Sequence, residues 1–221
     1  MTHTIALLET VPLTPDTAHY IFSKPDGYAF KPGQATDLAI DRDGWREETR
    51  PFTFTSDPEA PVLSFVIKTY PDHEGVTREL PDLKPGDTVE IGDPWGAIED
   101  KGPGTFIAGG AGITPFLGIL RDRARRGALQ GCHLIFANEA PEDIILHPLW
   151  EGLEDLRTTY TVEKAAQEGQ REGQIDAALL DDVIDDWTGP FYVCGPPAME
   201  DAVIDILKAR GVTDDRLIRE T

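Results

Sequence analysis

Three short segments of the chain carry residues that suit the binding of phosphate groups and flat aromatic rings. Arginine offers a fixed charge and a bidentate fork for phosphate, and glycine lets the backbone approach a ligand closely. Each segment adds an aromatic ring, a hydroxyl or a thiol to such residues. The segments are Arg50-Pro51-Phe52-Thr53, Gly109-Gly110-Ala111-Gly112-Ile113-Thr114-Pro115 and Cys194-Gly195-Pro196-Pro197.

The first segment is expected to form a short strand. On it, the Arg50 guanidinium could hold a phosphate, and Phe52 could stack on a flat ring from the same side of the strand. The Thr53 hydroxyl could bond to a ring nitrogen. The alternative is a surface arginine beside core aromatic residues, and the segment alone does not separate the two.

The second segment is expected to turn a strand directly into a helix. Thr114 is predicted to cap the helix N-terminus, with Pro115 at its first position. Free N–H groups and the positive end of the helix dipole suit a pyrophosphate, so the segment favours nucleotide binding over a purely structural turn. It is neither a G-x-G-x-x-G fingerprint nor a P-loop.

The third segment also ends a strand and opens a helix. Ligands of open α/β sheets bind at the carboxyl ends of the strands, so this loop and the glycine-rich loop could line one crevice. Cys194 is small and polarisable enough to lie against a nicotinamide ring. A buried structural thiol is the commoner state of a free cysteine, and both interpretations stay open.

The first hundred residues, which carry the arginine segment, are expected to form short strands. Residues 63–68 alternate and are rich in β-formers. Turn signals recur at Pro32-Gly33, Pro85-Gly86 and Gly92-Asp93-Pro94. Regular short strands with such punctuation predict a β-barrel or sandwich.

The rest of the chain carries the other two segments and alternates strands with helices. This order predicts a doubly wound α/β fold with a parallel sheet. Gly211 is expected just after the last helix, as its C′ residue. Residues 99–104 read as a linker, which divides the chain into 1–100 and 101–221. The expected strands are 105–108, 133–137, 159–162 and 191–194, and the expected helices are 115–126, 149–156, 177–184 and 198–210.

The composition limits the function classes. The 221 residues carry a net charge of −20, which argues against nucleic acid as a partner because its phosphates would be repelled. The charge suits solubility or high salt, and a docking face for a basic partner protein is the alternative. Two cysteines without a C-x-x-C pair, and histidines without ligand spacing, predict no metal site, so redox chemistry would need an organic cofactor.

The compartment is expected to be the cytoplasm. Residues 1–10 have no basic start and no long apolar run, so no secretory signal is predicted. No stretch approaches the roughly 18 apolar residues that a membrane span needs. Oligomeric state is not readable from the sequence.

Taken together and in this order, the segments resemble the ferredoxin–NADP reductase superfamily over nearly the whole chain. Arg50-Pro51-Phe52-Thr53 is similar to its Arg-x-Tyr-Ser/Thr flavin motif, with Phe52 in place of tyrosine. Val66-Ile67-Lys68 followed by Gly75-Val76-Thr77 resembles the segment that cradles the flavin pyrophosphate. The glycine-rich loop and Cys194 to Met199 are similar to the two pyridine-nucleotide loops.

The resemblance implies a flavin-binding β-barrel over residues 1–100, followed by an NAD(P)-binding α/β domain over 101–221. It implies that Arg50 meets a phosphate of FAD and that Phe52 lies against the isoalloxazine ring. Thr53 would bond near flavin N5, and Cys194 would lie near the nicotinamide carbon that gives up hydride. Glu220 resembles a near-terminal glutamate of the family, whereas the aromatic terminus of plant-type reductases is missing.

Asn138 and Glu139 follow the second strand of the α/β half, in a stretch similar to that of NADH–cytochrome b5 reductases. Glu139 would repel a 2′-phosphate and could accept hydrogen bonds from ribose hydroxyls, which favours NADH over NADPH. The alternative is that Glu139 is a solvated loop residue. Arg171 could still bind the 2′-phosphate of NADPH.

The expected function is therefore hydride transfer from NAD(P)H to FAD, followed by electron transfer to a ferredoxin, flavodoxin, cytochrome or small molecule. The alternative is a non-catalytic subunit that binds flavin and nucleotide. The expected catalytic residues are Thr53, Cys194 and Glu220. The expected cofactor-binding residues are Arg50, Pro51, Phe52, Thr53, Val66, Ile67, Lys68, Gly75, Val76, Thr77, Gly110, Gly112, Ile113, Thr114, Pro115, Asn138, Glu139, Cys194, Gly195, Pro196 and Met199.

Overall fold

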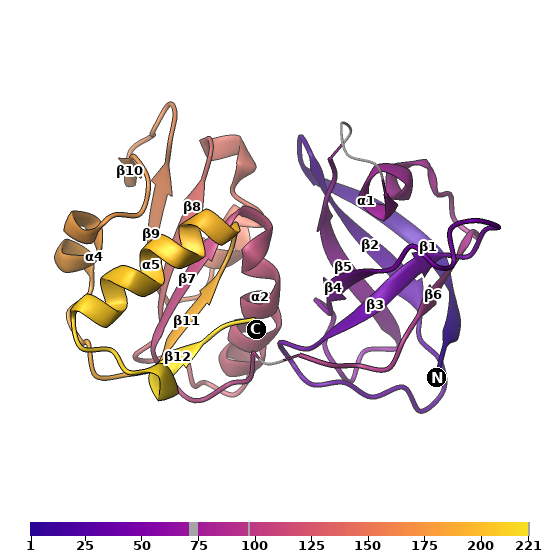
Figure 1. The fold of residues 1–221 in the computed structure, drawn as a ribbon, viewed down its shortest axis with the longest axis horizontal. Helices are drawn as coiled ribbons and strands as arrows, with labels where there is room; N and C mark the ends of the chain where they lie inside the picture. Colours follow the sequence, from indigo (N-terminus) through magenta and orange to yellow (C-terminus); the bar gives the residue numbers. More distant parts are fainter. Residues whose placement is uncertain (71–74, 97, 221) are drawn as a thin grey trace.

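The computed structural model describes residues 1–70, 75–96 and 98–220, and it consists of two sheet-based halves that lie side by side (Figure 1). His73 therefore lies outside the described residues. The first half is antiparallel and carries the arginine segment. The second half alternates strands and helices and carries the two loops.

The first half is one curled antiparallel sheet with the strand order β4-β3-β6-β1-β2-β5. Strands β4 and β5 form the two ends of this order, and a backbone hydrogen bond of 2.8 Å from Thr55 to Ser64 links the chain just after β4 to β5. The sheet is thus barrel-like but not closed. Its strands are β1 (His3–Thr14), β2 (Thr17–Ser23), β3 (Ala35–Ile40), β4 (Arg50–Thr53), β5 (Val62–Lys68) and β6 (Thr88–Ile91), with a short helix α1 (Val76–Glu79).

Alternation along β5 explains how the barrel meets its neighbour. Leu63, Phe65 and Ile67 point into the barrel core, whereas Val66 belongs to a hydrophobic cluster of the second half. A strand that is buried on both faces in this way joins the two halves through side-chain packing.

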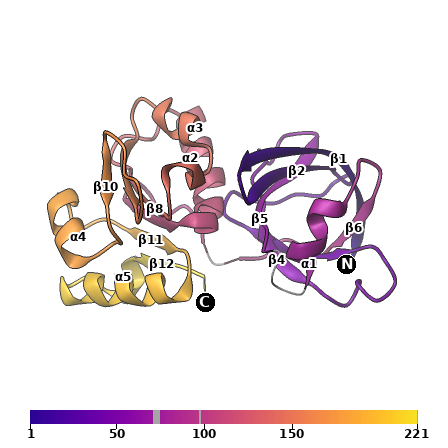
Figure 2. The same ribbon diagram turned by 90° about the horizontal axis from the view of Figure 1, so that it is seen from above.

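The second half has a parallel sheet with the order β10-β9-β8-β7-β11-β12. Helices α2 and α3 cover one face, and α4 and α5 cover the other (Figure 2). The strands are β7 (Thr105–Gly109), β8 (His133–Asn138), β9 (Arg157–Val162), β10 (Gln170–Glu172), β11 (Phe191–Cys194) and β12 (Leu217–Ile218). The helices are α2 (Thr114–Arg125), α3 (His147–Glu151), α4 (Ala177–Val183) and α5 (Pro197–Ala209).

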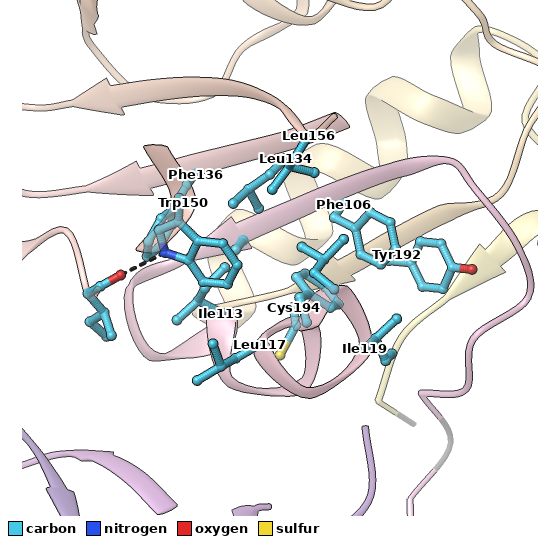
Figure 3. Packing of buried hydrophobic residues seen from close by; sticks show 14 of the residues in the cluster. Phe106, Ile113, Leu117, Ile119, Leu134, Phe136, Trp150, Leu156, Tyr192 and Cys194 are labelled. Carbon is cyan, nitrogen blue, oxygen red and sulfur yellow. Dashed lines mark hydrogen bonds between the residues drawn. The ribbon is translucent and has the colours of Figure 1, made fainter. Parts of the chain in front are cut away.

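The two faces of this sheet bury separate hydrophobic clusters. Phe106 of β7 points towards α2 and stacks on Tyr192 with ring centroids 4.1 Å apart (Figure 3). The next residue, Ile107, points towards α4 and α5. Trp150 lies in the α2 cluster and donates its indole N–H to the Ile145 carbonyl at 2.8 Å (Figure 3). Phe106 also meets Phe116 of α2 edge-on, so aromatic residues hold the helix that directly follows the glycine-rich loop.

Helix ends follow local chemistry in some places and not in others. Gly211 has φ +82° after α5 and closes a Schellman motif, which confirms the predicted C′ position. The predicted N-cap at Thr114 is wrong. A turn of 3₁₀ helix over Gly110–Ile113 precedes α2, so Thr114 is already helical and its hydroxyl donates to the Ala111 carbonyl at 3.0 Å.

One further expectation differs from the structure, and two strands were not predicted. The helix expected over 149–156 lies instead at His147–Glu151, and the short strands β10 and β12 lack a strong sequence pattern. Each of these two edge strands pairs with a longer neighbour, so tertiary context rather than local propensity forms it.

The segment between β6 and β7 is anchored to the second half. The Arg123 guanidinium of α2 bonds to the Asp100 carboxylate at 2.7 Å. The Tyr192 hydroxyl accepts from the Lys101 amide and donates to the Gly102 carbonyl, both at 2.8 Å. Residues 100–102 are therefore held by side chains of the α/β half.

Candidate functional site

A cleft of about 550 Å³ lies between the two halves. Both loops of the α/β half and the arginine segment of the barrel contribute to it, although they lie far apart in the sequence. This size is in the usual range for cofactor sites. Its lining includes Pro51, Phe52, Thr53, Val66, Ile67, Lys68, Thr77, Gly110, Gly112, Thr114, Cys194, Gly195, Pro196 and Glu220.

Arg50 and Gly75 meet at one end of the barrel. Arg50 begins β4, and its side chain is about half exposed. A methyl group built on Gly75 would lie 3.4 Å from an Arg50 guanidinium nitrogen. Gly75 has φ +128° and precedes α1, a conformation that favours glycine. The structure thus brings together two residues that the resemblance assigned to the phosphate groups of FAD.

The ring and hydroxyl of the arginine segment face the cleft differently. Phe52 is half-buried and packs partly against the barrel core, while Thr53 is buried, and both line the cleft. A flat ring lying on β4 would meet an aromatic side chain and a hydroxyl.

Several other predicted residues are core residues by their side chains. Val76 and Ile113 are fully buried, and Ile67 is almost so; Val76 and Ile67 belong to the barrel core and Ile113 to the α2 cluster. Pro115 is also buried and does not line the cleft. Residues of this kind shape the backbone and could offer a ligand only their main-chain groups.

The two nucleotide loops interlock through their glycines. A methyl group on Gly109 would lie 2.5 Å from the Met199 sulfur, and one on Gly195 would lie 3.1 Å from the Gly109 nitrogen. Gly110 has φ +51°, and a methyl group built on it would meet no atom of the described residues within 4 Å. The side chains of Met199 and Pro196 therefore leave no room for a side chain at Gly109. The backbone of Gly109 crowds Gly195, and Gly110 supplies the left-handed turn.

Cys194 ends β11 and lines the cleft, with only 8% of the residue exposed. Figure 3 shows it among the buried hydrophobic side chains around α2. Burial raises the pKa of the Cys194 thiol far above its ordinary value, and the Glu220 and Glu200 carboxylates add to this effect. The sulfur is therefore a neutral thiol at physiological pH, suited to packing against a ring and not to nucleophilic attack.

Two acidic residues stand beside this thiol. Glu200 accepts the Gly195 amide hydrogen at 2.8 Å and so fixes the loop that carries Cys194. Glu220 is exposed yet lines the cleft. Partial burial of its carboxyl raises the pKa, and the nearby Glu200 charge adds to the rise. Sequence reasoning missed Glu200. The available signal was an acidic residue in the first turn of a helix.

A second cavity of about 370 Å³ adjoins the cleft on the α/β half. Met199 and Asn138 line it, and Asn138 is 8% exposed. Among the described residues, neither the amide oxygen nor the amide nitrogen of Asn138 has a hydrogen-bond partner. Because buried amides are normally satisfied, this side chain fits a ligand that both donates and accepts, such as the hydroxyls of a sugar.

The rim of this second cavity is acidic. Glu139, Asp143 and Glu163 line it, and Glu139 forms an ion pair with Lys164. The hydrogen bond that Lys164 donates within this pair, together with the Lys164 charge, lowers the pKa of the Glu139 carboxyl. Arg171 pairs with Asp182 and does not line the cavity. A ligand carrying an extra phosphate would meet negative charge here.

No group of three or more metal-ligating side chains is found among the described residues. The same part of the chain contains no helix long and apolar enough to cross a membrane. Both cysteines, Cys132 and Cys194, are buried and free.

Comparisons with known proteins agree with this arrangement. A family model described as an oxidoreductase NAD-binding domain matches residues 106–205. The reductase component of propane 2-monooxygenase from Rhodococcus jostii is 30% identical over 88% of this chain and 56% of its own length. NADH-cytochrome b5 reductase 1 from Emericella nidulans is 33% identical over 83% of this chain and 65% of its own length. The chain thus spans less than two thirds of either relative.

A solved ferredoxin NADP⁺ reductase from Neisseria gonorrhoeae, with bound FAD and NADP, has the same fold. It superposes with a TM-score of 0.87 at 21% identity and covers 99% of this chain and 98% of its own. The match therefore includes the antiparallel half, which lies outside the family model. The fold, the family model and the relatives thus confirm the resemblance to the ferredoxin–NADP reductase superfamily that the sequence motifs indicate.

Proposed function

We propose that this chain is a flavin-dependent reductase that takes hydride from NADH and delivers electrons to a separate acceptor. The observation that carries the proposal is the cleft between the halves, where β4, the end of β5 and both nucleotide loops meet. FAD, when bound, would supply the conversion of a two-electron donor to one-electron steps, which side chains cannot perform.

The barrel residues would hold the flavin. Arg50 would bind a phosphate beside Gly75, where the backbone leaves room for it. Phe52 would lie against the isoalloxazine ring, and the Thr53 hydroxyl would bond near N5. Val66, Ile67 and Thr77 would supply the walls and main-chain groups of the same site.

The loops of the α/β half would hold the nicotinamide nucleotide. The turn at Gly110 to Ile113 would present main-chain N–H groups to the pyrophosphate. The neutral Cys194 thiol would pack beside the nicotinamide carbon that gives up hydride, and Glu220 would border the same space. Asn138 would bond to the adenosine ribose, which would satisfy its buried amide.

NADH suits the second cavity better than NADPH. The carboxylates of Glu139, Asp143 and Glu163 at its rim would repel a 2′-phosphate. Glu139 could also accept hydrogen bonds from the free ribose hydroxyls. Two free, buried cysteines support work in a reducing compartment such as the cytoplasm.

The acceptor is proposed to be a redox protein. The relative from Rhodococcus jostii is named as a reductase component of an oxygenase, and the one from Emericella nidulans as a cytochrome b5 reductase. The net charge of −20 favours a basic docking surface on the partner. A small-molecule acceptor is the second candidate.

Anaerobic stopped-flow reduction tests the proposal. The FAD-loaded protein should bleach near 450 nm with NADH, and much more slowly with equal NADPH. Titration of reduced protein with ferredoxin, flavodoxin and cytochrome should then return the colour with the true acceptor. A protein that cannot be loaded with FAD would contradict the proposal. A yellow protein that neither nucleotide bleaches would favour a non-catalytic binding subunit.

A further inference from the structure

Lys68 connects the two cavities. It is the last residue of β5, and it lines both the cleft between the halves and the second cavity. Its ammonium group pairs with the Asp16 carboxylate at 2.7 Å. Among the described residues that line the two cavities, Lys68 is the sole lysine or arginine, whereas the carboxylates are Glu139, Asp143, Glu163 and Glu220.

Asp16 is held firmly in this pairing position. Its carboxylate accepts hydrogen bonds from the Thr14 and Thr17 hydroxyls at 3.2 and 3.0 Å. Its carbonyl oxygen accepts from the Thr69 amide at 2.7 Å and from the Thr69 hydroxyl at 3.0 Å. The turn between β1 and β2 is thereby fastened to the end of β5, with the carboxylate aimed at Lys68.

Both partners remain charged. Burial opposes the ionised form of Asp16, yet hydrogen bonds from Lys68 and Thr17 hold its pKa below the ordinary value. For Lys68, burial likewise opposes the charge, but the Asp16 bond raises its pKa. The pair is therefore a fixed dipole whose positive end reaches the nucleotide cavity and whose net charge is zero.

The pair also acts on the acidic rim across the interface. Burial raises the pKa of the Asp143 carboxyl, Asp16 adds to the rise, and Lys68 opposes it. These opposing contributions place both members of the pair within electrostatic reach of the rim. A phosphate bound at that rim would feel the same two charges.

We propose that Asp16 is a specificity-determining residue, because it neutralises the Lys68 ammonium at the nucleotide cavity and so disfavours the phosphorylated coenzyme NADPH. The inference rests on the proposed function, since it takes the second cavity as the ribose end of the nucleotide site. Asp16 touches no nucleotide itself and acts through Lys68. Its effect should grow with the negative charge of the ligand.

Calorimetry tests this inference without any catalytic turnover. It measures the binding of NAD⁺ and NADP⁺ to the FAD-loaded protein at low and at high salt. Asp16→Asn keeps an oxygen for the two threonine hydroxyls but removes the charge. We expect it to tighten NADP⁺ about tenfold and NAD⁺ about threefold at low salt, on the scale of a Coulomb interaction near a protein surface. The difference should shrink in high salt.

Two further variants separate charge from local structure. Lys68→Met leaves Asp16 unpaired and should weaken NADP⁺ more than NAD⁺. The double variant Asp16→Asn/Lys68→Met restores a net charge of zero, so the ratio of the two affinities should return towards that of the original protein. Asp41→Asn is the matched control. Asp41 also pairs with an arginine and accepts a threonine hydroxyl, but it lines neither cavity.

The outcomes are distinguishable. If Asp16→Asn folds normally and leaves the ratio of affinities unchanged, or if Asp41→Asn shifts the ratio equally, this inference is overturned alone. If Asp16→Asn does not fold, the opposite shift in Lys68→Met still decides, and its absence overturns the inference. If the original protein binds neither nucleotide, the proposed function falls and the inference falls with it.

Discussion

The backbone of Gly112 lies directly against that of Cys194. A methyl group built on Gly112 would collide with the Cys194 carbonyl oxygen and would lie 2.6 Å from the Gly195 nitrogen. Because the obstacle is backbone, no rotamer change can relieve it. The glycine-rich loop and the cysteine loop are therefore one packed unit at the carboxyl edge of the sheet.

Gly112→Ala should separate these loops. We expect nucleotide affinity to fall at least about tenfold and the free energy of unfolding to drop by about 1–3 kcal/mol, as for overpacked sites. Calorimetry with NAD⁺ and a denaturant titration would measure the two effects. Gly92→Ala, where the nearest atom would be 3.8 Å away, is the control and should change neither.

Arg50→Ala should weaken flavin retention, because the half-exposed guanidinium beside Gly75 would lose its phosphate. Loss of a charge-assisted hydrogen bond predicts an increase of about tenfold or more in the dissociation constant of FAD. Fluorescence titration of the apoprotein would measure it. Arg46→Ala is the control. It removes an arginine that is paired with Asp41 and Asp43 and should leave the dissociation constant of FAD unchanged. Equal FAD affinity in both variants would remove Arg50 from the phosphate site.

Glu139→Arg should shift coenzyme preference towards NADPH. The substitution adds a cation at the acidic rim and also releases Lys164 from its ion pair. We expect the ratio of kcat/KM for NADPH over NADH to rise about tenfold or more, the scale of one charge-assisted contact. Glu142→Arg, at an exposed neighbour that does not line the cavity, should shift it much less. No shift would remove Glu139 from the ribose end of the site.

Cys194→Ser should slow hydride transfer without loss of flavin. The buried thiol is neutral, so the hydroxyl changes size and polarity where a ring would pack. We expect about a tenfold slower bleaching by NADH, the cost of a small misplacement of reacting atoms. The original thiol should resist iodoacetamide at pH 8. Cys132→Ser, placed before β8, is the control; equal rates in both variants would make Cys194 purely structural.

His133 should make the fold acid-sensitive. Burial, assisted by Arg157, lowers the pKa of His133 to about 4. The unfolded chain would bind a proton near pH 6.5, above the folded value, so this contribution to stability is present above pH 6.5 and lost as the pH falls towards 4. His133→Gln should reduce the stability loss over that window by up to about 3 kcal/mol. The less enclosed His147 is the control for the same substitution. Parallel pH curves for His133→Gln and the original protein would contradict the prediction.

Much of the fold could be predicted because its signals are local. Gly211 ends α5 through a left-handed turn that glycine adopts freely, and the β-formers over residues 63–68 form β5 as expected. The meeting of the two nucleotide loops could also be predicted, since parallel strands bring their carboxyl ends to one edge of the sheet.

Other features depend on distant partners and could not be predicted. Thr114 has the side chain of an N-cap, but the preceding glycines allow a 3₁₀ turn that moves the helix start. The pairing of Asp16 with Lys68 joins residues 52 positions apart, and Glu200 meets Gly195 only because α5 begins where it does. Types and spacing identify candidate residues, whereas packing decides which side chains face a ligand.

The anchored linker has a consequence for recombination of the two halves. Asp100, Lys101 and Gly102 are bound by Arg123 and Tyr192, so by its contacts this segment belongs to the α/β half although it follows the barrel in sequence. A chimera that exchanges the barrel would keep these contacts if its junction preceded Glu99. A junction after Gly102 would replace the residues that these side chains hold, and so remove the contacts that fasten this segment to the α/β half.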